Sequence, residues 1–371
     1  MKIALVHDEL VQSGGAERLI LAMHEIWSDA PIYTSICALE NLPSEFKKID
    51  IKTSFMQKLP FSKNLRRQYF FLYPFAFESF DFSGFDVVLS SSTRFAHGII
   101  TKPETLHICY SNSPTRFLWE TEKYLEGEKV GQMGKIILAP FLSYLRIWDQ
   151  TAVQRPDFWI ANSENVAAKL NKFYRKASTI IYPGVDLRRF QKSTKPHHLK
   201  PKTYFLVVSR LLSWKQIELA IKACDELKLS LKIVGVGPDY ARLKSLANSK
   251  VTFLGRVSEE DLISLYKNCK ALVLTQEEDF GITAIEAQAS GVPVIAFRGG
   301  GAKETIIEGK TGLFFYPQTP EALKETFVQF GKIRIEPQDC IKNAQKFSLQ
   351  NFQIQLKNFV EDTWQKFKRE N

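Results

Sequence analysis

Residues 271–301 read ALVLTQEEDFGITAIEAQASGVPVIAFRGGG, and this stretch decides the fold. Ala271–Thr275 is a short apolar run typical of a buried strand, and the residues from about Gly281 onward continue as a helix. Ser290-Gly291 then forms a turn into a second buried strand, Pro293–Phe297. Strand, helix and strand in this order predict a parallel βαβ unit.

Short apolar runs of the same kind recur along the chain and alternate with helical patterns. In the first half they are Lys2–His7, Asp86–Ser90, Thr105–Tyr110, Phe158–Ala161 and Thr179–Tyr182, and in the second half Tyr204–Ser209, Leu231–Val234, Val251–Leu254, Ala271–Thr275 and Pro293–Phe297. This alternation is typical of doubly wound parallel sheets, which bind ligands at the carboxyl ends of their strands. We therefore expect an α/β chain with two Rossmann-like domains that face a central cleft.

The domain boundaries follow from where the patterns change. Residues 1–187 are expected to form the N-terminal domain, residues 188–202 a linker without hydrophobic periodicity, and residues 203–347 the C-terminal domain. The final stretch, 348–371, repeats large apolar residues every three or four positions, as an amphipathic helix does. Its apolar face needs a docking surface, and we expect the N-terminal domain to provide it.

Composition narrows the class of protein. Of the 371 residues 44% are hydrophobic, so a sizeable core can form and extensive disorder is excluded. Fifty Lys and Arg face 40 Asp and Glu, and this dispersed excess fits anionic small molecules or an anionic membrane rather than nucleic acid. The five cysteines lack metal-site spacing. Because the first residues do not read as a signal peptide and no run of 18 apolar residues occurs, we expect a cytoplasmic protein.

Gly14 and Gly15 lie between the first strand and a helix expected at Ala16–Trp27. Backbone amides at such a turn can approach a ligand closely, and a helix N-terminus favours an anion. The G-x-G-x-x-G fingerprint of nicotinamide-binding domains and the P-loop are both absent from the sequence. The glycine pair therefore indicates either a phosphate contact or only a tight turn.

Arg210 and Lys215 follow the strand at Tyr204–Ser209. Two cations at the carboxyl end of a strand suit a diphosphate, because Arg binds phosphate oxygens bidentately and Lys supplies a point charge. Taken alone, the pair is equally compatible with a solvated surface.

Glu278 and Glu286 enclose seven residues around the helix start near Gly281. The N–H groups of residues 281–283 would face a phosphate, and carboxylates suit sugar hydroxyls. Acidic residues also stabilise helix starts, which explains the acidic run 277–279 but not Glu286.

These motifs occur in a defined order along the sequence: GGAER (14–18), SRL-x3-K (209–215), VGxGP, FLGRV, the E-x7-E block followed by GVPV, and GGAKE (300–304). The set resembles the retaining glycosyltransferase family 4, which has the GT-B fold, over nearly the whole chain. The segments SNSPTRFLWE (111–120) and YPGVD (182–186) further resemble bacterial mannosyltransferases that extend lipid-linked O-antigen or exopolysaccharide precursors.

The resemblance implies roles on the donor side. Arg210 and Lys215 would bind the donor diphosphate and stabilise the leaving group, and Glu278 would contact the transferred sugar. Positions that would bind other parts of the donor are Gly14, Gly15, Arg256, Val257, Phe280, Gly281, Ile282, Thr283 and Glu286. Because the sequence has no D-x-D motif, we expect no metal and no other cofactor.

On the acceptor side the resemblance places Asn112, Arg116 and His97. Relatives often carry His in an H-x-P-x-R pattern where this chain has Asn112, and Lys where it has His97. Retention would proceed by front-face attack, in which a donor phosphate oxygen takes the acceptor proton and no protein nucleophile is needed. Asn cannot act as a general base, although it can hydrogen-bond a sugar hydroxyl.

Residues 46–76 combine seven Lys or Arg with one Asp and many Phe and Tyr. Cations with aromatic residues suit the interface of an anionic membrane. The alternative is a core helix whose Phe side chains point inward. With the resemblance, the pattern favours a peripheral protein on the inner face of the plasma membrane.

The expected activity is transfer of a hexose, mannose from GDP-mannose, to a lipid-linked saccharide. Two alternatives stay open: a UDP-sugar-dependent glycosyltransferase, and a non-catalytic sugar-nucleotide-binding protein. A phosphorylase of the same fold fits poorly, because it needs a lysine for pyridoxal phosphate in a much longer chain.

Overall fold

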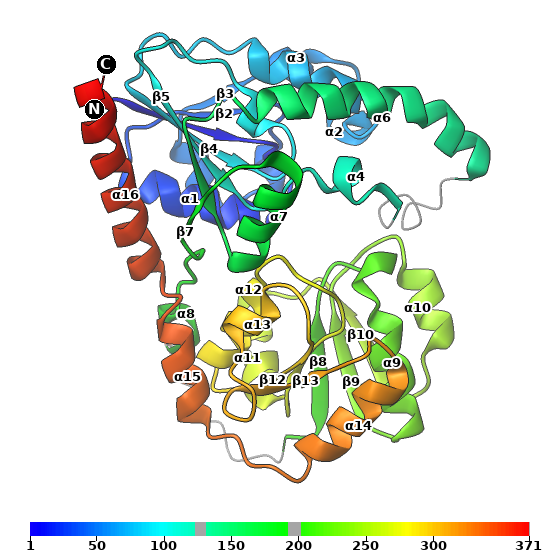
Figure 1. The fold of residues 1–371 in the computed structure, drawn as a ribbon. Helices are drawn as coiled ribbons and strands as arrows, with labels where there is room; N and C mark the ends of the chain where they lie inside the picture. Colours follow the sequence, from blue (N-terminus) through cyan, green and yellow to red (C-terminus); the bar gives the residue numbers. More distant parts are fainter. Residues whose placement is uncertain (123–130, 192–201, 371) are drawn as a thin grey trace. The chain divides into compact units, whose positions relative to one another are not determined.

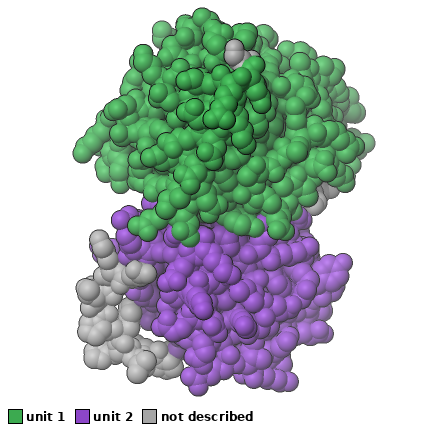
Figure 2. Space-filling model, turned by 60° about the vertical axis from the view of Figure 1, so that its left-hand side comes forward, with its two compact units in different colours: residues 1–184, 350–371 green, residues 185–349 purple. Residues whose placement is uncertain are grey.

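The computed structural model describes residues 1–122, 131–191 and 202–370 (Figure 1). They form two compact units, which Figure 2 distinguishes by colour: unit 1 is Met1–Gly184 with Gln350–Asn371, and unit 2 is Val185–Leu349. Most of the linker expected at 188–202 falls on residues 192–201, outside the described residues, and its first four residues form the short helix α8 (Arg188–Gln191).

Unit 1 is built on a seven-stranded sheet in the order β3-β2-β1-β4-β5-β6-β7, with every neighbouring pair parallel. The strands are β1 (Ile3–His7), β2 (Ile32–Thr34), β3 (Ile51–Thr53), β4 (Val87–Ser92), β5 (Leu106–Ser111), β6 (Phe158–Ala161) and β7 (Thr179–Ile180). The five strands expected in this half are confirmed. We did not predict β2 and β3, because each is three residues long and carries no run of apolar residues.

Helices cover both faces of this sheet (Figure 1). The longer ones are α1 (Gly15–Ile26), α6 (Gln132–Ala152), α7 (Glu164–Tyr174) and α16 (Leu349–Glu370). The short ones are η1 (Leu39–Asn41), η2 (Ser44–Lys48), η3 (Phe55–Lys58), α2 (Ser62–Leu65), η4 (Phe70–Leu72), α3 (Tyr73–Glu78), η5 (Ala96–Gly98) and α4 (Arg116–Trp119). No helix in the described ranges is both long enough and apolar enough to cross a bilayer.

Residues 46–76 do not form the single core helix that we considered as an alternative. The segment is broken into β3 and several short helical turns. Its aromatic residues divide between two environments, since Phe46 and Tyr73 are buried whereas Phe61, Phe71 and Phe75 are exposed.

The C-terminal helix α16 packs on unit 1, as expected. Phe352, Leu356 and Val360 are buried at four-residue spacing, and the Phe352 ring meets Tyr110 of β5 edge to face. The Gln353 side-chain amide donates to Glu25 of α1. Residues at opposite ends of the chain therefore share one core.

Unit 2 contains a six-stranded parallel sheet in the order β10-β9-β8-β11-β12-β13. Its strands are β8 (Tyr204–Val208), β9 (Ser230–Val234), β10 (Val251–Gly255), β11 (Leu272–Leu274), β12 (Val294–Phe297) and β13 (Gly312–Phe315). Besides α8, its helices are η6 (Ser213–Lys215), α9 (Ile217–Glu226), α10 (Tyr240–Leu246), α11 (Glu259–Asn268), α12 (Ile282–Ala289), α13 (Ala302–Thr305), α14 (Pro320–Phe330) and α15 (Pro337–Gln345). The five strands expected here are confirmed, and edge strand β13 is additional.

Candidate functional site

The loops that follow β8 and β11 meet at one edge of the unit 2 sheet. The two strands are parallel neighbours, so the residues after each of them emerge at the same edge. The Thr275 hydroxyl, just after β11, donates to the backbone carbonyl of Lys215 at 2.8 Å. This hydrogen bond ties the loop that carries Arg210 and Lys215 to the loop that carries Glu278.

Lys215 and Glu278 form an ion pair at this edge, with Nζ 2.5 Å from Oε1. The Lys215 ammonium also lies 4.2 Å from the centre of the Trp214 ring, a cation–π contact. The side-chain amide of the buried Gln276 donates to the same Glu278 oxygen at 2.5 Å. The structure thus brings together two of the three residues that we predicted to be catalytic, while the third, Arg210, is exposed in the same loop.

The glycine turn after β12 shapes the loop that carries Glu278. A Cβ atom on Gly300, whose φ is +57°, would lie 2.1 Å from the Glu278 carbonyl oxygen. The Gly301 amide donates to that same carbonyl at 2.8 Å. Only glycine permits this approach, so the GGAKE motif positions Glu278.

A second glycine pair supports the Arg210 loop in the same way. Gly235, at a φ of +136°, would place a Cβ atom 1.8 Å from the Ser209 carbonyl oxygen, and Gly237 would place one 2.2 Å from that of Leu211. The VGxGP motif is therefore a close packing of two backbone segments beside Arg210.

Helix α12 begins directly after Gly281, which adopts a left-handed φ of +91°. Ile282 and Thr283 form its first turn, where backbone N–H groups lack intrahelical acceptors, as the prediction of a phosphate contact requires. The Phe280 side chain, in contrast, is buried against Phe347 with the ring centres 5.5 Å apart. Its ring thus anchors the loop, and only its backbone is near the helix start.

Glu286 lies on the second turn of α12 and is buried. The hydroxyl of Tyr266, from α11, donates to Glu286 Oε2 at 2.9 Å. Tyr266 is fully buried, and Phe190 packs edge to face against it. A rigid tyrosine therefore fixes the orientation of the carboxylate that we expect to contact a ribose. Sequence reasoning missed Tyr266, because one tyrosine on a mixed helix gives no signal.

Arg256 and Val257 follow β10, the edge strand of the sheet. Gly255 ends that strand with a φ of +66°, and its carbonyl accepts from the Gly235 amide at 2.8 Å. Arg256 is exposed and Val257 is half-buried. Contact between these residues and a nucleotide base stays a prediction.

In unit 1, Gly14 and Gly15 lie at the start of α1, as expected. A Cβ atom on Gly14 would lie 2.8 Å from the carboxylate of Glu17, which is buried. Because this carboxylate is the end of a flexible side chain that can shift, the contact alone does not require glycine at position 14.

The two acids that end the first strand are also buried. Asp8 accepts from the Thr93 hydroxyl and from the backbone amides of residues 93–96. Burial opposes its charge, but Arg94 and these hydrogen bonds outweigh burial, so the pKa of Asp8 is lowered. Glu9 pairs with Arg66 and Arg94. These acids hold loops in place at the carboxyl end of the unit 1 sheet.

Asn112 and Arg116 lie just after β5. The Asn112 amide donates to the Ser91 hydroxyl at 2.9 Å, and Arg116 Nε donates to the Ser113 hydroxyl at 3.2 Å. Both side chains are half-buried. They lie near the carboxyl ends of β4 and β5, and their contact with an acceptor stays a prediction.

The structure places His97 in the core and not on an acceptor surface. Its ring is 2% exposed and packs among Trp148, Trp159 and Tyr174. The ring also lies 3.2 Å from a carboxylate oxygen of Asp149. In this structure the side chain therefore offers almost no surface to an acceptor.

Asp149 is a buried carboxylate to which sequence reasoning gave no role. Trp119 Nε1, the Tyr174 hydroxyl and the Thr115 hydroxyl all donate to it, at 2.7, 2.8 and 2.9 Å. Two of these donors flank Arg116, so Asp149 fixes the loop that presents Arg116. An acid within the largely apolar helix α6 is the signal that could have found it.

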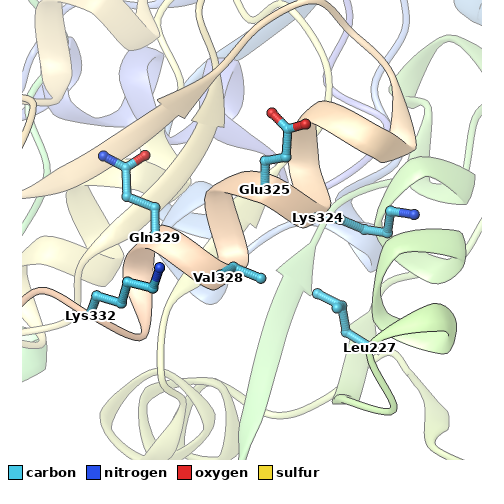
Figure 3. Close-up of a pocket in the computed structure, with 6 residues that line it drawn as sticks. All are labelled: Leu227, Lys324, Glu325, Val328, Gln329 and Lys332. Atoms are coloured by element: carbon cyan, nitrogen blue, oxygen red, sulfur yellow. The ribbon is translucent and has the colours of Figure 1, made fainter.

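A shallow hollow lies elsewhere on unit 2, between the end of α9 and α14 (Figure 3). Its lining residues are Leu227, Lys324, Glu325, Val328, Gln329 and Lys332. Leu227 precedes β9, so the hollow is at the amino end of the strands, opposite the predicted donor residues. One of its charged residues, Lys324, is already paired with Glu226.

Comparison with known proteins decides the nature of unit 2. Residues 189–347 match the family model described as "Glycosyl transferases group 1". Unit 2 is therefore similar to group 1 glycosyltransferases over nearly its whole length. The matched residues include Arg210, Lys215 and Glu278 in the loops described above, and Glu286 on α12.

Relatives of this chain include the glycosyltransferase MJ1178 of Methanocaldococcus jannaschii, which is 26% identical over 50% of this chain and 52% of that protein. The alpha-1,3/1,6-mannosyltransferase ALG2 of Dictyostelium discoideum is 26% identical over 51% and 56%. The chain spans about half the length of the curated relatives that it matches.

Solved structures cover the chain more completely. Anabaena HepE, crystallised in complex with UDP, aligns with 98% of this chain and 100% of its own, with a TM-score of 0.70 at 17% identity. Its likeness shows the fold alone, and with the two parallel sheets it confirms the expected two-domain GT-B architecture.

Proposed function

We propose that the chain transfers a hexose from a nucleotide sugar to a lipid-linked saccharide. The observation that carries the proposal is the Lys215–Glu278 pair at the carboxyl end of the unit 2 strands, where Lys215 shares its loop with Arg210, in a region that matches the group 1 glycosyltransferase model. A diphosphate would bring negative charge to the two cations, and Glu278 would then accept hydrogen bonds from the sugar hydroxyls.

The proposed reaction retains the configuration at the anomeric carbon. The bond between this carbon and the donor phosphate oxygen breaks, the bond to the acceptor oxygen forms on the same face, and a donor phosphate oxygen takes the acceptor proton. Arg210 and Lys215 stabilise the negative charge on the leaving nucleoside diphosphate. These cations take the place that a metal ion occupies in other transferases, so we propose that no metal is required.

GDP-mannose is our first choice of donor, and the match to a mannosyltransferase supports it. The likeness to a protein crystallised with UDP keeps UDP-sugars as the second choice. A thermal-shift screen of GDP-, UDP- and ADP-sugars with the full chain separates them. A larger rise in unfolding temperature with UDP-sugars than with GDP-mannose would reverse the choice.

We also propose that the acceptor is anchored in an anionic membrane, on whose inner surface the protein binds. Residues 46–76 support this proposal, because they expose Phe61, Phe71 and Phe75 next to an excess of Lys and Arg. Incubation with the donor and lipid-linked saccharides extracted from bacterial membranes tests the transfer itself. Donor turnover that is equally fast with and without the extract would contradict a lipid-linked acceptor.

A non-catalytic sugar-nucleotide-binding protein is the second candidate, and Asn112 favours it, because members of the family that the sequence resembles often carry His at this position. Saturable donor binding without transfer to any acceptor would identify it.

A further inference from the structure

Helix α6 carries large apolar side chains both on the face that packs against unit 1 and on the face exposed to solvent. Its inner face packs Leu142, Leu145 and Trp148 into the core of unit 1. Its outer face exposes six large apolar side chains at three- and four-residue spacing: Met133, Ile136, Ile137, Phe141, Tyr144 and Ile147. Met133 is 74% exposed and Ile147 is 70% exposed, so the stripe runs the length of the helix. A continuous exposed apolar stripe of this kind marks a docking surface.

The described part of this helix carries no acidic residue between residues 132 and 148. Lys135 is exposed, whereas the Arg146 guanidinium donates to the Leu118 carbonyl and the Thr121 hydroxyl. Helix α6 runs alongside α2 and α3 (Figure 1), and the Phe70 ring contacts Phe141 with centres 6.4 Å apart. The stripe thus adjoins residues 46–76, where seven Lys or Arg accompany one Asp.

We propose that the outer face of α6 inserts into the interface of an anionic lipid membrane. Apolar side chains would enter the boundary between headgroups and acyl chains, while the adjoining cations meet lipid phosphates. A second copy of the chain is a poorer occupant, because pairing this face with itself would bring like charges together. The helix lies in the membrane plane, since its inner face stays packed in the protein core. The proposal deepens the membrane partner named under "Proposed function", but its test does not require transferase activity.

The chain suits a site-specific probe, because all five native cysteines are buried. Ile137→Cys labelled with an environment-sensitive fluorophore should brighten and shift to the blue on vesicles of phosphatidylglycerol and phosphatidylcholine. The matched control is Ile354→Cys on α16, where the native side chain is 59% exposed in the same unit. The control label should not respond. Equal responses at the two positions, or none at position 137, would overturn the proposal.

Vesicle flotation then measures how much of the binding this face supplies. Ile136→Ser with Ile147→Ser should lower the partition coefficient on anionic vesicles at least tenfold, whereas Ile354→Ser should leave it unchanged. Circular dichroism and the thermal shift with nucleotide sugar confirm that the double variant folds and still binds its donor. Unchanged partitioning of the double variant would refute the proposal. So would a wild-type chain that is a dimer, if the double variant is a monomer and still binds vesicles as well as the wild type does. Vesicle binding through α6 in a chain that binds no nucleotide sugar would instead refute the proposed function and leave the docking face standing.

Discussion

The two sheets use charged residues at their carboxyl edges in different ways. After β1 in unit 1, Asp8 is enclosed by donors from residues 93–96, and Glu9 lies between two arginines. After β8 and β11 in unit 2, Lys215 and Glu278 pair with each other, and Arg210 is exposed in the same loop as Lys215. Charged residues at the carboxyl ends of the strands of an α/β sheet can therefore stabilise the fold or bind a ligand. Substitutions should distinguish the two roles, because the first changes stability and the second changes activity.

Removal of Asp8 should have the largest effect, and it should fall on stability. Asp8→Ala leaves four backbone amides of residues 93–96 without their acceptor in a buried site. Because each unpaired buried donor is costly, we expect a loss of about 3–5 kcal/mol in the free energy of unfolding of unit 1. Chemical denaturation monitored by tryptophan fluorescence measures it.

Asp81 provides the matched control for Asp8. It also accepts a backbone amide, from Ser83, but on the surface. Asp81→Ala should leave the unfolding midpoint unchanged. Similar midpoints for Asp8→Ala and the wild type would show that the unit 1 acids do not serve the fold.

Removal of Lys215 should act on catalysis instead. Lys215→Ala should lower kcat/KM for the nucleotide sugar by about 100- to 1,000-fold, the scale of losing one preorganised contact to a developing negative charge. Steady-state transfer assays measure this loss. Lys324, which pairs with Glu226 at the opposite edge of the same unit, is the control. If Lys324→Ala lost as much activity, the site would be misplaced.

The hydroxyl of Tyr266 should matter less, and only through the ribose. Tyr266→Phe removes the hydrogen bond to Glu286, and we expect KM for the donor to rise about tenfold with little change in kcat. With a donor whose ribose lacks its 2′- and 3′-hydroxyl groups, wild type and variant should have equal KM values. A tenfold difference that persists with this donor would assign Tyr266 a merely structural role.

Features that follow from a repeated sequence pattern, such as the strands and their parallel order, could be predicted from the sequence. Central strands such as Tyr204–Val208 are continuous apolar runs, and parallel order brings the residues after β8 and β11 together. Contacts made by single side chains gave no pattern, which is why Gln276 and Tyr266 were missed. His97 was misplaced because similarity to a motif does not report whether a side chain faces solvent or core.

The smallest expected effect is the pH dependence of the free energy of unfolding, which should also differ between the two units. Burial lowers the pKa of His7 and lowers that of His107 to about 3, with His97 and Arg155 contributing to the latter. The His107 ring therefore stays neutral in the folded protein near pH 5, and the His7 ring takes up its proton at a lower pH than an unfolded histidine, which does so below about pH 6.5. Because the unfolded state then binds more protons, stability must fall as the pH drops from 7 to 5.

Unit 1 should carry this dependence, since the described part of unit 2 contains no histidine. Each buried ring contributes at most about 1.4 kcal/mol per pH unit below pH 6.5. Denaturation at pH 7, 6 and 5 should show a slope that His107→Gln reduces. His24→Gln should reduce it less, because His24 is only partly buried and burial lowers its pKa more weakly against the opposing charges of Asp29 and Glu25. A slope that His107→Gln leaves intact would mean that this buried histidine does not set the response of unit 1 to acid.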